Sequence, residues 1–338
     1  MIVHMNAAYL QKVSRRVFVT GFAAFALTAL GACERSGPSR QSTRSFFAFD
    51  TVVSVKASCD KSVLDALEER CTYYESLFSR TVESSDVGRI NRAGGSSVEV
   101  APETAERVTR ALEYCRSSDG LFDITIGAAS ELWDFKKHVV PDSAALARAR
   151  QHIDYRCVEV KGNTITVLDP QAKLDLGGIA KGYIADKLVL LLEDAGCKCG
   201  FVNLWGNVQT VGTRPDGSAW NVGVRDPNGD ETSVFARVSS TGGSVVTSGL
   251  YERRFELDGV GYWHILDPKT GYPVQSDIVS ATIVSTESID GDGYTKPLFM
   301  LGAREALAWI NAHEELQGML ITGDGRALKS ANSTIEVL

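Results

Sequence analysis

Long apolar runs are missing from most of this 338-residue chain, although 44% of its residues are hydrophobic. No internal segment approaches the roughly 18–20 consecutive apolar residues that a membrane-spanning helix needs. We therefore expect the body of the chain to fold in water. The charged content of 23% is ordinary for a globular protein, and the length suffices for one large domain or two modest ones.

An excess of basic residues is missing too. The chain has 35 Lys and Arg against 42 Asp and Glu, without a basic stripe or patch. Nucleic acid is therefore not an expected partner, because its phosphates attract clustered basic side chains. The cysteines have neither the spacing of a zinc site nor that of a redox CxxC pair. Most are expected to be small buried side chains, and the sequence leaves their disulfide pairing open.

The N-terminus has the pattern of an export signal. Arg15 and Arg16 precede an apolar stretch over residues 18–32, which is typical of a twin-arginine signal peptide and too short to span a bilayer. Cys33 follows the small residues of a lipoprotein cleavage site, so we expect a lipid anchor there. The protein is then exported across the cytoplasmic membrane and anchored to its outer face. The expected divisions are a signal peptide over residues 1–32, a tether over 33–45 and one domain over 46–338.

Periodicity predicts helices and strands in no regular alternation. The clearest helix covers residues 178–195, where a glycine pair precedes the apolar face and Gly196 ends it. Further helices are predicted over residues 62–78, from Pro102 onward, over 142–152 and over 304–311. Strands are predicted over 46–55, 157–160, 164–168, 201–204, 220–224, 234–239, 253–257, 279–284 and 319–321. Because strands dominate, the expected class is α+β rather than a doubly wound sheet.

Residues 175–182 predict an anion site where a helix begins. A short strand ends at Asp175, Gly177 and Gly178 allow close backbone approach, and the helix starts at once. Its free amides and positive end favour an anion, to which Lys181 adds a full charge. The pattern suits a pyrophosphate, and its spacing excludes a P-loop and a dinucleotide GxGxxG. A tight turn with a solvated lysine explains the same residues about equally well.

Other segments also carry polar groups suited to chemistry. His264, in the turn-rich loop 264–273, has the properties of a general base, although a lone histidine is more often structural. Residues 290–296 set oxygen donors between glycines, which suits a hard cation such as Mg²⁺. Taken alone, the segment is better explained as an acidic surface turn. Loop 119–127 suits a flavin or nucleobase pocket, and loop 203–207 could close over a ligand.

Taken in order, these segments resemble the ApbE family, the FAD:protein FMN transferases. The resemblance covers about residues 46–325, and loop 264–273 is its most specific part. The matching segments are 49–51, 77–80, 89–91, 119–123, 175–182, 222–227, 247–249, 251–253 and 264–273. Each is weak alone, but their common order makes chance agreement remote.

The resemblance implies one α+β domain of T-fold type, with mixed or antiparallel sheets, whose loops hold FAD in a cleft. It implies that the residues lining FAD are Phe49, Thr81, Leu121, Phe122, Asp123, Asp175, Lys181 and Leu266. It also places a Mg²⁺ ion at the Gly178 carbonyl and Asp292, with Thr295 as a further candidate ligand.

The implied reaction transfers the FMN part of FAD to a Thr or Ser hydroxyl of an exported acceptor protein, through a phosphodiester bond, and releases AMP. Mg²⁺ at Asp292 and the Lys181 ammonium would neutralise the pyrophosphate while the hydroxyl attacks the FMN phosphorus in line. His264 is the favoured base. Two alternatives stay open: an FAD pyrophosphatase that uses water as acceptor, and a lipoprotein that binds FAD without catalysis.

Three residues depart from the family pattern. Lys296 stands where a threonine usually follows the metal-binding aspartate by one helical turn. Either Thr295 rotates in, or the Lys296 ammonium stands in for part of the cation's charge and weakens the metal dependence. Trp205 replaces a glycine, which alters the shape of the pocket. Thr81 stands where an aromatic residue often covers the FAD, which favours turnover over tight retention.

Overall fold

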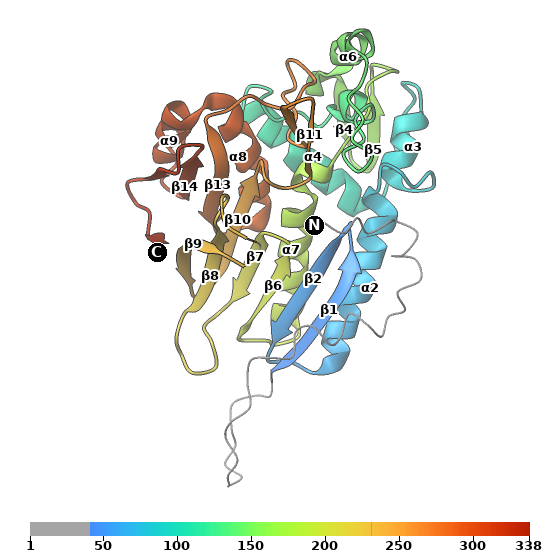
Figure 1. Cartoon of the computed structure of the whole chain (residues 1–338). Helices are drawn as coiled ribbons and strands as arrows, with labels where there is room; N and C mark the ends of the chain where they lie inside the picture. Colours follow the sequence, from blue (N-terminus) through green and yellow to red (C-terminus); the bar gives the residue numbers. More distant parts are fainter. Residues whose placement is uncertain (1–40, 231) are drawn as a thin grey trace. The chain divides into compact units, whose positions relative to one another are not determined.

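Eight antiparallel strands form the main sheet of the structure, a computed structural model that describes residues 41–230 and 232–338 (Figure 1). In sheet order they are β1 (Ser42–Ala48), β2 (Thr51–Ala57), β6 (Gly200–Leu204), β7 (Asn207–Val211), β10 (Gly243–Gly249), β13 (Ile278–Ser285), β14 (Gln317–Thr322) and β15 (Ala327–Lys329). The predicted α+β class is confirmed.

Three small sheets and the helices complete the fold. The small sheets are β16 (Glu336–Val337) with β9 (Val234–Ser240) and β8 (Trp220–Arg225), β3 (Val98–Glu99) with β5 (Thr164–Val167) and β4 (Val158–Lys161), and the hairpin of β11 (Arg254–Leu257) and β12 (Val260–Trp263). The α-helices are α2 (Lys61–Phe78), α3 (Asp86–Arg92), α4 (Pro102–Ser117), α5 (Gly127–Ser130), α6 (Ser143–Ala149), α7 (Gly177–Asp194), α8 (Ser288–Leu301) and α9 (Ala303–Asn311), and two short 3₁₀ turns cover Arg150–His152 and Tyr155–Cys157.

Strand β10 lies at the centre of the layers because its alternate side chains face opposite ways. Val245 packs in the core between the main sheet and the sheet of β8, β9 and β16. Val246, its neighbour, points to the other face, where it contacts Gly291 of α8. Helices α7 and α8 cover this second face together with α2 and α9. The sheet is therefore buried on both sides at the point where α8 crosses it.

Helices α7 and α8 pack against each other unusually closely. A Cβ atom added at Gly182 of α7 would lie 2.4 Å from the carbonyl oxygen of Ser288 and 2.6 Å from the Cα atom of Ile289, at the start of α8. Only glycine permits this backbone contact. The contact brings the first turns of α7 beside the first turns of α8, and the functional residues of both helices lie there.

The predicted strand over residues 46–55 is wrong in one respect, because it is two strands joined by a tight turn. Phe49 and Asp50 both have positive φ, at 55° and 57°, and β1 folds back on β2 there. Neither residue is a glycine, so the usual hairpin signal is missing from the sequence. Strand β1 also begins at Ser42, inside the segment 33–45 that was expected to be a tether.

The segment 290–296 was expected to be a turn, and this is also corrected: it lies within α8. Strands β3, β7, β10, β12, β15 and β16 and the short helices α3 and α5 were not predicted at all. The other predicted helices and strands are confirmed, with ends that differ by a few residues. The expected signal peptide and the Cys33 anchor lie outside the described residues. Within the described part of the chain, every helix is too short or too polar to cross a membrane.

Candidate active site

Asp175 organises the turn that begins α7. Its Oδ1 atom accepts a hydrogen bond from the Gly177 amide at 2.9 Å, and its Oδ2 atom accepts one from the Ser130 hydroxyl at 2.8 Å. The Arg80 guanidinium lies 3.3 Å from the same Oδ2 atom. Arg80 is the neighbour of Thr81, which is exposed. The structure therefore brings two predicted FAD-lining segments together at the N-terminus of α7.

Phe122 lies directly against the first turn of α7. A Cβ atom added at Gly178 would approach its ring to 2.7 Å, so the glycine is needed for this contact. The carboxylate of Asp123 is buried and accepts hydrogen bonds from the amide and hydroxyl of Thr125 and from the amide of Tyr155. Burial raises the pKa of the Asp123 carboxyl more than these hydrogen-bond donors lower it. Asp123 thus holds its own loop in shape, beside the aromatic ring.

Lys181, one turn into α7, donates a hydrogen bond from Nζ to the carbonyl oxygen of Trp205 at 3.2 Å. Trp205 has a φ of 47°, in the left-handed region that favours glycine. A glycine would adopt this conformation without strain. The tryptophan is 50% exposed, so its indole remains accessible beside the lysine.

Asp292 and Lys296 form a buried ion pair one turn apart on α8. Lys296 Nζ lies 2.6 Å from Asp292 Oδ1, and Asp292 Oδ2 accepts a hydrogen bond from the Gly182 amide at 2.7 Å. Asp292 is 1% exposed. Burial alone would raise the pKa of this carboxyl, but the charges of Lys296 and Lys181 and the two hydrogen bonds lower it overall. The carboxylate is ionised and both of its oxygens are already engaged.

The residues present do not fit a Mg²⁺ site of the expected kind. The Lys296 ammonium lies 2.6 Å from Asp292 Oδ1, so this oxygen already has a positively charged partner. The hydroxyl of Thr295 is buried and lies 2.9 Å from the Ser248 hydroxyl, so it is not directed at Gly178 or at the carboxylate. Over residues 41–230 and 232–338, no group of three or more His, Cys, Asp and Glu side chains is placed to hold a metal.

Glu252 and His264 complete the group of polar residues. His264 donates from Nδ1 to the Glu252 carbonyl oxygen at 3.1 Å, which leaves Nε2 as a free acceptor on a neutral ring. Burial, followed by the charge of Arg253, lowers the pKa of His264 to about 3. Burial raises the pKa of the Glu252 carboxyl, although the charges of Lys181 and Lys296 lower it in part.

Electrostatics favour an anionic ligand in this cluster. The charges of Lys181, Lys296 and Arg253 all act on Glu252 and His264, and the carboxylates of Asp292 and Glu252 oppose them. An excess of positive charge beside the N-terminus of a helix suits a pyrophosphate. Glu252 was part of a matched segment but had no predicted role.

Arg107 of α4 is a further residue that sequence reasoning missed. Its side chain is fully buried, donates to the Leu176 carbonyl oxygen at 2.5 Å and lies 4.1 Å from the centre of the Phe78 ring. Burial lowers its pKa to about 9, so it stays charged at neutral pH and adds positive potential beneath the start of α7. The sequence did contain a sign of this burial: Arg107 lies one turn before Ala111, on the apolar face of the predicted helix.

The remaining predicted residues lie around this centre. Phe49 sits in the turn between β1 and β2, with its amide 3.2 Å from Glu75 Oε1. Leu121 is half-buried. Leu266 is buried in a separate apolar cluster with Trp133. Their predicted contacts with FAD stay predictions.

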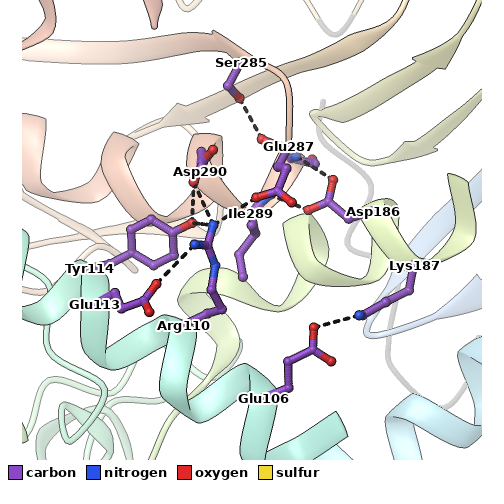
Figure 2. Close-up of polar contacts among 11 residues, drawn as sticks. Glu106, Arg110, Glu113, Tyr114, Asp186, Lys187, Ser285, Glu287, Ile289 and Asp290 are labelled. Atoms are coloured by element: carbon purple, nitrogen blue, oxygen red, sulfur yellow. Dashed lines mark hydrogen bonds and ion pairs between the residues drawn. The ribbon is translucent and has the colours of Figure 1, made fainter. Parts of the chain in front are cut away.

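Helix α8 is held in place by a polar network on its first turn (Figure 2). Asp186 of α7 accepts hydrogen bonds from the amides of Ser288 at 2.7 Å and Ile289 at 2.9 Å. From α4, the Tyr114 hydroxyl donates to Asp290 at 2.5 Å, and Arg110 pairs with the same carboxylate at 3.3 Å. These contacts fix the position of α8, and with it Asp292 and Lys296.

Comparison with known proteins gives one consistent result. The sequence model of the ApbE family matches residues 49–320. The FAD:protein FMN transferase of Treponema pallidum is 32% identical over 329 residues, which cover 90% of this chain and 91% of that protein. A protein of the same name from Klebsiella pneumoniae is 34% identical over 278 residues, which cover 78% and 84% of the two chains.

Solved structures agree with these sequence relatives. The ApbE protein of Thermotoga maritima superimposes with a TM-score of 0.80 at 32% identity, over 86% of this chain and 97% of the other. The flavin transferase ApbE of Vibrio cholerae gives a TM-score of 0.78 at 25% identity, over 87% and 98%.

Proposed function

The chain belongs to the ApbE family, and we propose that it is an FAD:protein FMN transferase. It transfers the FMN part of FAD to a threonine or serine hydroxyl of an acceptor protein and releases AMP. The acceptor oxygen forms a bond to the FMN phosphorus while the bond from that phosphorus to the bridging oxygen breaks. The bridging oxygen leaves with AMP, and the hydroxyl proton passes to a base.

One observation carries the proposal: two lysines from different helices meet beside the amides of an α7 N-terminus. Lys181 and Lys296 act electrostatically on the same carboxylates, and their ammonium groups neutralise the charge that builds up on the leaving phosphate. The positive N-terminal end of α7 favours the other phosphate oxygens. Phe122, packed on Gly178, gives the flavin or adenine ring an apolar neighbour.

His264 is the proposed base. The hydrogen bond from Nδ1 to the Glu252 carbonyl orients the ring and leaves Nε2 able to accept the proton of the incoming hydroxyl. Because the pKa of His264 is lowered to about 3, the ring is neutral throughout the physiological pH range, and the same shift makes it a weaker base than an ordinary histidine.

Mg²⁺ is the part of the expectation that the donor set does not support, so no step of this proposal uses it. For location, we propose export through the twin-arginine signal and a lipid anchor on Cys33, which rests on the sequence pattern of residues 14–33. The acceptor is then an exported protein.

The test is mass spectrometry of a candidate acceptor domain incubated with the purified chain and FAD, beside an assay for AMP. The proposal expects a mass gain equal to FMN minus water, with one AMP released per modified acceptor. AMP without the mass gain, for every acceptor tried, would make the protein an FAD pyrophosphatase. Tight FAD binding with neither product would make it a binding protein without catalysis.

A further inference from the structure

Lys296 forms part of the site itself and is not a peripheral surface charge. Its side chain is 17% exposed, and its Nζ atom lies 2.6 Å from Asp292 Oδ1, whose side chain is 1% exposed. The other oxygen of Asp292 accepts the Gly182 amide at 2.7 Å. Each carboxylate oxygen of Asp292 therefore already has a donor, and the donor on Oδ1 is a charged ammonium.

A divalent cation at Asp292 would have to displace this ammonium or lie beside it. Displacement leaves a buried ammonium without its partner, and coexistence sets like charges within a few ångströms in a poorly hydrated site, so both cost free energy. Thr295 offers no relief, because its hydroxyl is buried against the Ser248 hydroxyl at 2.9 Å.

Lys296 also lies where an added positive charge acts on the reaction. It is linked to α7 through Asp292, which bonds both the Lys296 ammonium and the Gly182 amide, and Lys181 is the residue next to Gly182 on that helix. Gly182 and Asp292 connect α7 to α8 by a direct hydrogen bond. The spacing of the two lysines is thus fixed by the close contact of the two helices.

We propose that the Lys296 ammonium replaces a divalent cation in this enzyme, so that FMN transfer proceeds without a metal. The inference rests on the proposed function. Lys296 and Lys181 together neutralise the pyrophosphate; the acceptor oxygen bonds to the FMN phosphorus, the bond to the bridging oxygen breaks, AMP leaves, and the proton goes to His264. The overall reaction is the same, and only the source of the positive charge differs.

The experiment measures AMP release and acceptor modification with FAD in excess EDTA and then at rising Mg²⁺ concentration. The wild-type chain is expected to keep its rate in EDTA within about twofold. Lys296→Thr restores the family's hydroxyl, and its rate in EDTA is expected to fall about 100-fold and to recover with Mg²⁺. Lys296→Met keeps the length without the charge, and we expect it to stay slow in both conditions.

A second readout does not depend on turnover. Binding of Mn²⁺ is followed by electron paramagnetic resonance of each FAD-loaded protein. We expect binding for Lys296→Thr and none for the wild-type chain. The matched control is Lys187→Thr on the same helix as Lys181; Lys187 pairs with Glu106 at 2.7 Å, outside the cluster, so this variant should keep the wild-type metal response.

The outcomes separate the two claims. A wild-type chain that is inactive in EDTA and active with Mg²⁺ overturns the metal-free inference and leaves the transferase in place. Lys296→Thr with an unchanged rate in EDTA overturns the role of the lysine. No AMP and no modified acceptor, at any Mg²⁺ concentration, overturns the transferase itself and with it this inference.

Discussion

Asp186 connects the stability of the fold to the position of the site. Helix α8 has no side-chain cap from its own sequence, and the Asp186 carboxylate on α7 accepts its first two amides instead, at 2.7 and 2.9 Å (Figure 2). Replacing the residue by the isosteric, uncharged Asn keeps an acceptor and removes the titration. Replacing it by Ala removes both, which typically costs about 1 kcal/mol for a helix cap.

Burial raises the pKa of Asp186 from 3.8 to about 7, more than its amide partners lower it. In the unfolded chain the carboxyl ionises near its ordinary value. Between about pH 4 and pH 7 the unfolded chain therefore gives up a proton that the folded chain keeps. The stability that this carboxyl contributes is full below about pH 4, falls as the pH rises and is lost above about pH 7. The difference in pKa corresponds to about 4 kcal/mol, and since the side chain is partly exposed, we expect about 2 kcal/mol in solution.

Urea unfolding followed by tryptophan fluorescence, at several values from about pH 4.5 to pH 8, measures this slope. Relative to the wild-type chain, Asp186→Asn should gain about 2 kcal/mol in free energy of unfolding across that range. The free energy of unfolding of Asp186→Ala should depend on pH in the same way as that of Asp186→Asn, but should be lower at every pH. If the wild-type and Asn curves run parallel, the carboxyl does not titrate in this range and the argument from burial is refuted.

Three further predictions concern the site. His264→Gln should lower the transfer rate about 100-fold. Because the pKa of His264 is about 3, the pH–rate profiles of the wild-type chain and the variant should have the same shape between about pH 5 and 8. A titration seen only in the wild-type profile would contradict a neutral histidine. Gly182→Ala should cost about 2 kcal/mol in thermal unfolding, because its Cβ would lie 2.4 Å from the Ser288 carbonyl oxygen; a wild-type melting temperature would mean that α7 and α8 can separate freely. Asp175→Ala should weaken FAD binding in calorimetry about tenfold, because it frees the turn and Arg80, while Asp175→Asn should lose less; unchanged affinity would remove this turn from the FAD site.

Elements with a local signal could be predicted from the sequence. Helix α7 has an apolar face and a terminal glycine, and the β4–β5 hairpin has a glycine turn, so periodicity and turn chemistry identified both. The turn at Phe49 has no such signal, because two side chains with positive φ carry it. Strand β10 reads as Gly, Ser, Val and Thr and becomes a strand only because the main sheet pairs with it on both sides.

Helix α8 shows why the rest could not be predicted. Glycines at 291 and 293 indicate a turn, since each costs a helix about 1 kcal/mol. In the fold, a Cβ atom at Gly291 would lie 2.5 Å from Val246, and one at Gly293 would lie 2.5 Å from Tyr114. The helix can approach β10 and α4 this closely only without side chains at those positions. Val246 and Tyr114 are both far from this segment in the sequence, so the neighbouring residues do not show why glycines are needed there.

The chemistry of the site depends on that same packing. If they formed a turn, residues 290–296 would offer two carboxylates, Asp290 and Asp292, to a metal. As a helix, they place Asp290 toward α4, where Tyr114 donates to it at 2.5 Å, and leave Asp292 alone in the site with Lys296 four residues on. That spacing puts the two side chains on one face, and the ion pair at 2.6 Å follows. Lys296 therefore changes the charge around Asp292 as a whole, because the other acidic side chain of the segment, Asp290, is directed to α4.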